Sequence, residues 1–94
     1  MAHRVVWSRR ALQDLEAIAT YIAQDSPAYA SVVVRNIFNL TKTLARFLRS
    51  GRKVPEFDDE ALREVVAYSY RIIYRLQQED VIISAVIHGK RILQ

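Results

Sequence analysis

Three closely spaced apolar segments in the last third of the chain limit its possible folds more than any other feature. They cover residues 62–66, 70–76 and 81–91, are rich in Val, Ile and Tyr, and are separated only by short polar breaks. β-Branched and aromatic residues favour strands, and breaks of this length are typical of hairpin loops. We therefore predict three consecutive antiparallel strands that lie side by side in one sheet.

The residues before these strands predict two helices. Apolar side chains recur every three or four positions over residues 9–24 and again over 27–49, so each segment has one apolar face. Ser8 and Ser26 stand where an N-cap hydroxyl would accept a backbone N–H from the first turn. Gly51 is expected to end the second helix in the left-handed conformation. The short break between the helices predicts an antiparallel helical hairpin.

The whole chain, residues 1–94, is predicted to form one α+β domain. Its 94 residues suit a single small domain, and residues 3–7 add a short strand before the helices. The expected order is β-α-α-β-β-β, with the helical hairpin packed on one face of the sheet. Residues 52–60, which contain a proline and an acidic cluster, are expected to form a loop.

Alternation along the strands predicts which side chains face the helices. On the middle strand the helix-facing set is Tyr70, Ile72, Tyr74 and Leu76, and the opposite set is Arg71, Ile73 and Arg75. On the last strand, one face carries Val81, Ile83, Ala85 and Ile87, and the other carries Ile82, Ser84, Val86 and His88. Ile73, Ile82 and Val86 then form an apolar patch beside cations, which indicates a protein partner. Alternatively, a loop or the C-terminal tail covers this patch.

Basic residues dominate the middle of the chain. The formal net charge is +4, and no acidic residue occurs between Asp25 and Glu56. The basic residues of this stretch are Arg35, Lys42, Arg46, Arg49, Arg52 and Lys53. A segment of one charge sign favours a polyanion such as nucleic acid, or an acidic protein partner. The alternative is an ordinary solvated helix face that happens to be basic.

Composition argues against several classes of function. The chain has no cysteine, which excludes disulfides and thiolate chemistry, and it has no apolar run near the roughly 20 residues of a membrane span. Its N-terminus lacks the features of a signal peptide, so we expect a cytoplasmic protein. It contains no Gly-rich phosphate loop, and two histidines without cysteine argue against a zinc site. We therefore expect no cofactor, metal, membrane or small-molecule ligand.

Charged residues near the strand ends have the composition of a metal-free ribonuclease site. Five cations that could meet at one rim and bind a target or its phosphates are Arg63, Arg71, Arg75, Lys90 and Arg91. The candidate catalytic set is Arg71, Arg91, His88, which could move protons, and Glu56, which could accept one. Two of these charged residues have a structural alternative. His88 could be a hydrogen-bonded surface group, and Arg75 could form an ion pair with Glu64 or Glu79.

Segments along nearly the whole chain resemble the RelE/ParE superfamily of bacterial toxins from type II toxin–antitoxin modules. These segments are residues 11–22, 26–27, 51–57, 62–64, 70–75 and 86–91. The resemblance implies a growth-inhibiting toxin that a cognate antitoxin holds inactive. An acidic antitoxin would complement the basic charge, and its docking would account for the apolar patch of Ile73, Ile82 and Val86.

The superfamily divides by target, and this sequence looks closer to the ParE-like branch. RelE-like members cut messenger RNA in the ribosome, and Arg71 and Arg91 look like two of their functional arginines. However, Leu62 and Glu64 stand where one such group has active-site lysines. The Gly-Arg-x-Val-Pro-Glu loop and the His-Gly-x-Arg ending look more like ParE, whose members inhibit DNA gyrase without hydrolysis. The alternatives are a ribosome-dependent endoribonuclease and an inactive module member that binds only its antitoxin.

Overall fold

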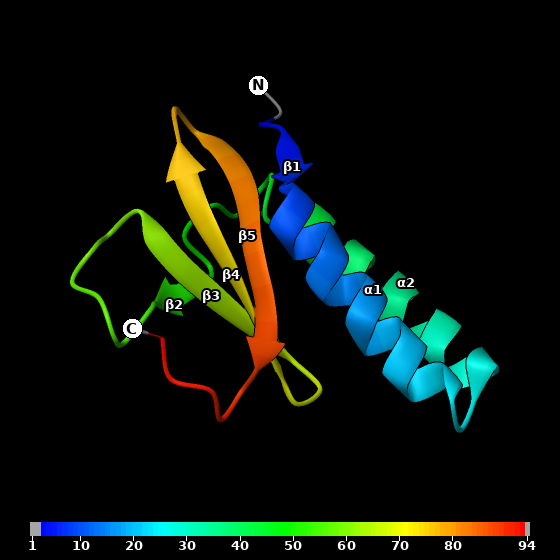
Figure 1. Cartoon of the computed structure of the whole chain (residues 1–94). Helices are drawn as coiled ribbons and strands as arrows, with labels where there is room; N and C mark the ends of the chain where they lie inside the picture. The colour runs from blue at the N-terminus through cyan, green and yellow to red at the C-terminus, as the bar shows by residue number, and fades with distance from the viewer. Residues whose placement is uncertain (1–2, 94) are drawn as a thin grey trace.

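The computed structural model describes residues 3–93, over which two helices pack beside one five-stranded sheet (Figure 1). The elements in chain order are β1 (Val5–Trp7), α1 (Arg9–Ala23), α2 (Pro27–Thr43), β2 (Arg52–Lys53), β3 (Leu62–Ala67), β4 (Tyr70–Gln77) and β5 (Asp80–His88). The strand order is β1-β5-β4-β3-β2, with β1 parallel to β5 and all other neighbours antiparallel. The predicted α+β class and the closing antiparallel meander are confirmed. The short strand β2 is an addition, since residues 52–60 were expected to form only a loop.

Both helices begin at the predicted serine caps. The Ser8 hydroxyl accepts the Ala11 N–H at 3.0 Å, and the Ser26 hydroxyl accepts the Tyr29 N–H at 3.1 Å. These bonds satisfy backbone donors that the first turn of a helix leaves without a partner. Neither helix of the described chain has the length and apolar character that a membrane crossing requires.

The second helix ends at Thr43 rather than at the predicted Arg49, and turns follow it. The Tyr74 hydroxyl fixes these turns, because it donates to the Leu48 carbonyl at 2.9 Å and accepts the Gly51 N–H at 3.0 Å. The prediction of a left-handed Gly51 is wrong, since no described glycine has a positive φ. Close packing explains the glycine instead: an added Cβ would lie 2.5 Å from the Glu64 carbonyl oxygen.

The larger apolar core lies between the helical hairpin and one face of the sheet. Its buried members are Ala11, Leu15, Val33, Ile37, Leu44, Ile72, Tyr74, Val81, Ile83 and Val86. Tyr70 and Leu76 pack against this core, so the predicted helix-facing set of β4 is confirmed. Phe47 belongs to the apolar periodicity of residues 27–49 but is 59% exposed, because the helix ends before it.

An extra residue in β5 interrupts the alternation of its side chains. Ile73 pairs with Ala85, but the next residue, Tyr74, pairs with Ile83, so Ser84 has no partner on β4. One additional residue in one strand of an antiparallel pair is a β-bulge. Side chains beyond a bulge point to the opposite faces from those that strict alternation assigns.

The bulge makes the predicted faces of β5 wrong from Ala85 onward. Val86 packs into the larger core under the helices, whereas Ala85 and Ile87 lie on the opposite face. His88 pairs with Tyr70, so these two side chains share the helix side of the sheet. Their rings contact each other edge to face, with centroids 6.1 Å apart.

The other face of the sheet is covered by a loop and the C-terminal tail rather than by helices. Its smaller buried cluster consists of Val54, Ile73, Ala85 and Ile87, with Leu62 and Leu93 packed against it. The prediction of an uncovered patch is therefore wrong for Ile73 and Val86, which are 4% and 3% exposed. For Ile73 the structure has the alternative, cover by a loop and the tail, whereas Val86 lies under the helices because of the bulge. Ile82 stays half-buried.

Candidate functional site

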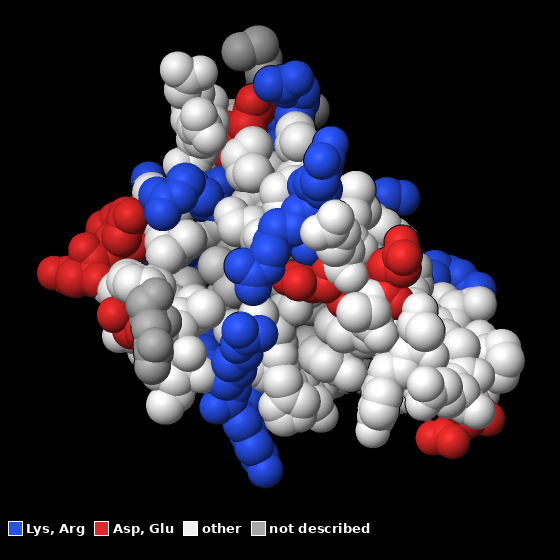
Figure 2. Space-filling view, in the orientation of Figure 1, with Lys and Arg blue, Asp and Glu red and all other residues white. Residues whose placement is uncertain are grey.

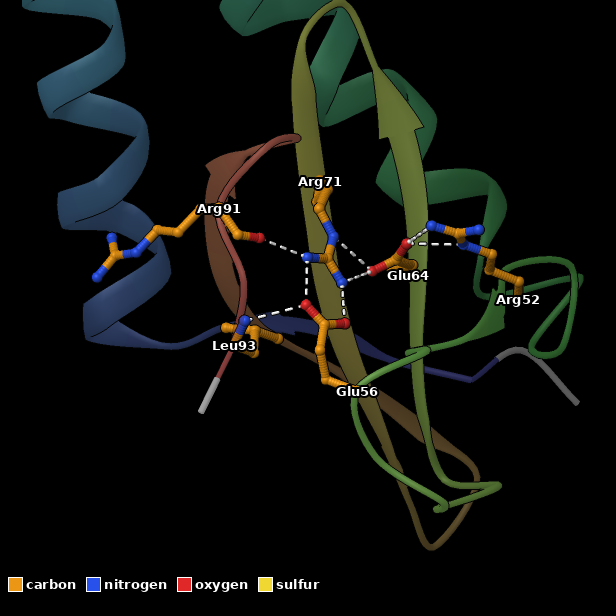
Figure 3. Close-up of polar contacts among 6 residues, drawn as sticks. All are labelled: Arg52, Glu56, Glu64, Arg71, Arg91 and Leu93. Carbon is orange, nitrogen blue, oxygen red and sulfur yellow. Dashed lines mark hydrogen bonds and ion pairs between the residues drawn. The ribbon is translucent and has the colours of Figure 1, made fainter.

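A buried network of charged side chains lies on the sheet face that the tail covers (Figure 3). Arg71 extends from β4, Glu64 from β3, Arg52 from β2 and Glu56 from the loop that follows β2. Arg71 is 5% exposed and Glu64 is 1% exposed, so both charges are removed from water. Burial of a charge is unfavourable unless ion pairing and hydrogen bonds compensate it.

Arg71 uses every donor of its guanidinium. Its Nε and Nη2 both donate to Glu64 Oε1, at 2.8 and 2.6 Å. Its Nη2 and Nη1 donate to Glu56 Oε1 and Oε2, each at 2.7 Å. The remaining Nη1 hydrogen reaches the Arg91 carbonyl oxygen at 2.7 Å. A guanidinium has five N–H donors, so Arg71 has none left for another ligand in this conformation.

Glu64 and Glu56 complete the network on either side of Arg71. The second oxygen of Glu64 accepts the Arg52 Nε at 2.8 Å, with Arg52 Nη2 2.7 Å away. Glu56 Oε2 also accepts the Leu93 N–H at 2.9 Å. Hydrogen bonds from Arg71, and then from the Leu93 backbone, lower the pKa of Glu56 from 4.5 to about 2. The hydrogen bond to Glu56 in turn raises the pKa of Arg71.

A surface cleft opens above this network, between the β2–β3 loop and the tail. Its volume is about 360 Å³, and its charged lining residues are Arg52, Glu56, Arg71, Lys90 and Arg91. The structure thus brings together Glu56, Arg71 and Arg91, which the sequence proposed as a set. Arg91 contributes its backbone carbonyl, however, and Figure 3 shows its side chain pointing away from Arg71.

The predicted rim of five cations does not form. The Arg63 guanidinium donates to the Gly51 carbonyl at 2.8 Å and to Glu60 at 2.7 Å. Arg75 pairs with Asp59 at 3.2 Å, not with Glu64 or Glu79 as expected. Arg71 is buried within the network, which leaves only Lys90 and Arg91 of the five with exposed side chains near the cleft.

His88 does not join Glu56 and Arg71. Its position opposite Tyr70 places the imidazole on the helix side of the sheet, whereas the charged network lies on the other side. Its Nδ1 accepts the Lys90 N–H at 3.2 Å, which gives the ring a local structural role. The bulge at Ser84 is the reason, because it reverses the faces of the last part of β5.

The sequence reasoning missed Glu64 and Arg52 as members of the network. Alternation on β3 places Glu64 on the same face as Arg71, since Glu64 pairs with Ile73. Glu64 and Arg71 are therefore diagonal neighbours across two strands, a separation that long side chains span. No comparable sequence signal exists for Arg52, because its partner depends on the unexpected strand β2. Within residues 3–93, no three histidine or acidic side chains converge in a way that would hold a metal ion.

Comparison with known proteins yields matches over nearly the whole chain. A family model described as the ParE toxin of type II toxin–antitoxin system parDE matches residues 5–93. Protein Y4kP of Sinorhizobium fredii, named as a toxin candidate, is 34% identical over 88 residues, which are 92% of this chain and 88% of that protein.

Two solved structures share the fold. A chain of the chromosomal ParDE toxin–antitoxin system from P. aeruginosa has a TM-score of 0.76 at 21% identity, with 95% of this chain and 98% of that chain covered. A chain of the toxin–antitoxin complex RelBE2 from Mycobacterium tuberculosis has a TM-score of 0.57 at 23% identity, with 94% and 99% covered. The ParDE chain is therefore the more similar of the two in structure.

Proposed function

The chain belongs to the ParE toxin family of type II toxin–antitoxin systems, and we propose that it arrests growth by binding DNA gyrase, without cutting RNA. The observation that carries this proposal is the state of Arg71, whose five donors are all bonded inside the fold. The family match over residues 5–93 and the better structural fit to the ParDE chain support the same choice.

The geometry favours a binding surface over a ribonuclease site. Cleavage of RNA without a metal requires a free cation at the phosphate and an acid–base pair on the same side of it. Arg71 would have to leave Glu64, a carboxylate with 0% side-chain exposure, to reach a phosphate. Loss of one partner from a buried ion pair costs about 3–5 kcal/mol, which makes such a rearrangement unfavourable. His88, the other candidate for proton transfer, lies across the sheet from Glu56.

The direct test is an assay of purified protein on purified gyrase. We expect loss of supercoiling activity, or accumulation of cleaved DNA, at micromolar concentrations of the protein. Messenger RNA translated in its presence should carry no codon-positioned cuts. Gyrase that is unaffected at this excess, together with cuts that disappear in Arg71→Ala and His88→Ala variants, would show the ribosome-dependent endoribonuclease instead. Gyrase acts in the cytoplasm, which is accordingly the compartment we propose for this protein.

We also propose that a cognate antitoxin neutralises the protein. Both solved structures that share its fold come from toxin–antitoxin systems. Because Ile73 and Val86 are buried, we propose instead that the antitoxin docks in a groove of about 490 Å³ between α1 and α2 near the tip of the hairpin. Its lining is mostly apolar and includes Ala19, Ala23, Pro27 and Val34.

Docking of the antitoxin in this groove can be tested by introducing one bulky charged side chain there. Ser31 lies at its edge and is exposed, so Ser31→Arg should weaken antitoxin binding about tenfold or more while the fold stays intact. Gln77→Arg introduces the same charged side chain at an exposed position on β4 and serves as the control. If both variants bind the antitoxin purified from the adjacent reading frame as tightly as the wild type, the groove is not the docking surface.

A further inference from the structure

The tail that follows β5 has no regular secondary structure, yet hydrogen bonds fix its backbone along most of its length. The Gly89 N–H donates to the Ser69 carbonyl at 2.6 Å, and the Arg91 N–H donates to the His88 carbonyl at 2.9 Å. The Arg91 carbonyl and the Leu93 N–H are bound by Arg71 and Glu56, at 2.7 and 2.9 Å. An irregular segment with this many backbone bonds has a defined shape before any partner arrives.

Although hydrogen bonds fix the backbone of this segment, the side chains of residues 90–92 extend into solvent. Lys90, Arg91 and Ile92 are all exposed, and Ile92 at 72% is the most exposed large apolar side chain in the described chain. Neither Lys90 nor Arg91 forms an ion pair within residues 3–93. In Figure 2, a column of basic side chains extends from the lower edge of the molecule, beneath the end of β5.

We propose that Arg71 and Glu56 are positioning residues that hold residues 90–92 as a preformed contact knob, and that this knob binds an acidic protein surface on the toxin's target. The proposal rests on the proposed function only in assuming that the protein is a toxin that works by binding. Arg71, which the sequence predicted to bind the target directly, acts through the backbone of Arg91 instead.

The composition of the knob favours a protein surface over a nucleic acid backbone. Two cations alone would suit phosphates, but an exposed isoleucine directly after them offers apolar area that phosphates cannot use. Protein interfaces combine an apolar anchor with charges at its rim, which matches Ile92 beside Lys90 and Arg91. Because the backbone is already fixed, binding does not have to order it, and that ordering would otherwise lower the affinity.

The first experiment removes the charges of the knob. Lys90→Glu combined with Arg91→Glu should reduce growth arrest on induction, with at least a tenfold higher dose of toxin needed, while thermal stability and antitoxin binding stay as in the wild type. Arg9→Glu combined with Arg10→Glu changes the net charge equally at exposed positions in the first turn of α1 and should leave growth arrest intact. Equal toxicity of the knob variant and the wild type, or an equal loss in both double variants, would overturn the proposal.

The second experiment tests whether Glu56 acts through the knob. Glu56→Ala keeps the buried Arg71–Glu64 pair but removes the acceptor of the Leu93 N–H, so amide exchange at Arg91 and Leu93 should speed up at least tenfold. Toxicity should fall with it. In a Lys90→Ala and Arg91→Ala background, Glu56→Ala should cause no further loss, because the side chains that it positions are gone. An equal loss in both backgrounds would show that Glu56 contributes only general stability.

Growth arrest is the readout because it does not depend on which target is correct. If the knob variant loses toxicity while wild-type protein leaves purified gyrase unaffected, the proposal that the knob binds the target is supported and the gyrase proposal fails. If the wild type and the knob variant inhibit gyrase equally, the gyrase proposal is supported and the proposal that the knob binds the target fails. A wild-type protein that does not arrest growth would refute both.

Discussion

The two faces of the sheet are buried by different means. The helix side relies on ten buried apolar residues, which come from both helices, from Leu44 just after α2, and from strands β4 and β5. The tail side has only four, and its cover consists of a loop and an irregular segment. Ordering such segments costs about 1–2 kcal/mol per residue in backbone entropy, more than four apolar side chains offset. The network around Arg71 adds hydrogen bonds to the loop through Glu56 and to the tail through the Arg91 carbonyl and the Leu93 N–H. Apolar packing therefore covers one face of the sheet, and polar contacts help to hold the cover of the other.

The largest effect should come from removing the centre of that network. Arg71→Ala leaves Glu64 without its main partner in a buried site, which should lower the free energy of unfolding by about 3–5 kcal/mol. Arg75→Ala is the matched control, because its ion pair with Asp59 is exposed and should contribute about 0–1 kcal/mol. Urea unfolding of the two variants measures the difference. Similar losses in both would mean that the tail side does not depend on buried charge.

The next comparison uses two neighbouring isoleucines that face opposite sides of the sheet. Ile72 is 0% exposed under the helices and Ile73 is 4% exposed under the tail. We expect Ile72→Ala to cost about 4 kcal/mol and Ile73→Ala about 2 kcal/mol, since a loop and a tail can collapse into a cavity more easily than packed helices. Thermal unfolding monitored by circular dichroism would show which of the two variants loses more stability. A larger loss at Ile73 would contradict this account of the two faces.

The two glycines differ in how closely the chain approaches them. A Cβ on Gly51 would lie 2.5 Å from the Glu64 carbonyl oxygen, whereas a Cβ on Gly89 would lie 3.1 Å from the Ser69 carbonyl oxygen. Gly51→Ala must therefore shift backbone and should cost about 2 kcal/mol, but Gly89→Ala should cost less than about 1 kcal/mol. The midpoints of denaturant unfolding of both variants test this. Equal midpoints would show that the backbone at Gly51 yields more readily than its contacts indicate.

The smallest expected effect is the pH dependence that Glu56 adds to the tail side. Its pKa falls from 4.5 to about 2 in the folded protein, so its stabilising effect is complete above pH 4.5 and is lost as the pH falls toward 2. The stability difference between wild type and Glu56→Gln should therefore be widest near neutral pH and shrink through this window. Thermal midpoints of both proteins across the window provide the measurement. A gap that stays constant would mean that Glu56 is not ionised beside Arg71.

Much of the helix side was predictable because its signals are local. Ser8 and Ser26 cap their helices as expected, and the apolar periodicity identified the helix-facing set of β4. The bulge in β5 was not predictable, since it depends on distant residues. The Val86 N–H at the bulge donates to Asp14 of α1 at 2.9 Å, and the Ser8 hydroxyl donates to the Ser84 carbonyl. Because these contacts join segments far apart in the chain, the local sequence of an apolar strand predicts strict alternation.

The sequence predicted which residues meet at the candidate site better than it predicted what those residues do there. Glu56, Arg71 and Arg91 do meet at one cleft, but as a structural network and a backbone acceptor. Alternation assigns a side chain to a face and does not give the path of a loop, so the approach of Glu56 to Arg71 could not be derived. The same limit hid the pairing of Arg75 with Asp59. The parallel pairing of β1 with β5 also joins segments far apart in sequence.

The way in which the tail is held has an evolutionary consequence. Arg71 and Glu56 bind a main-chain carbonyl and a main-chain N–H, groups that every residue type except proline provides, and do not contact the side chains at positions 90–92. Mutations at these three positions therefore change what the protein presents without altering how it folds. If residues 90–92 bind the target as proposed, substitutions there would change specificity one exposed residue at a time without changing the hydrogen bonds that hold the tail.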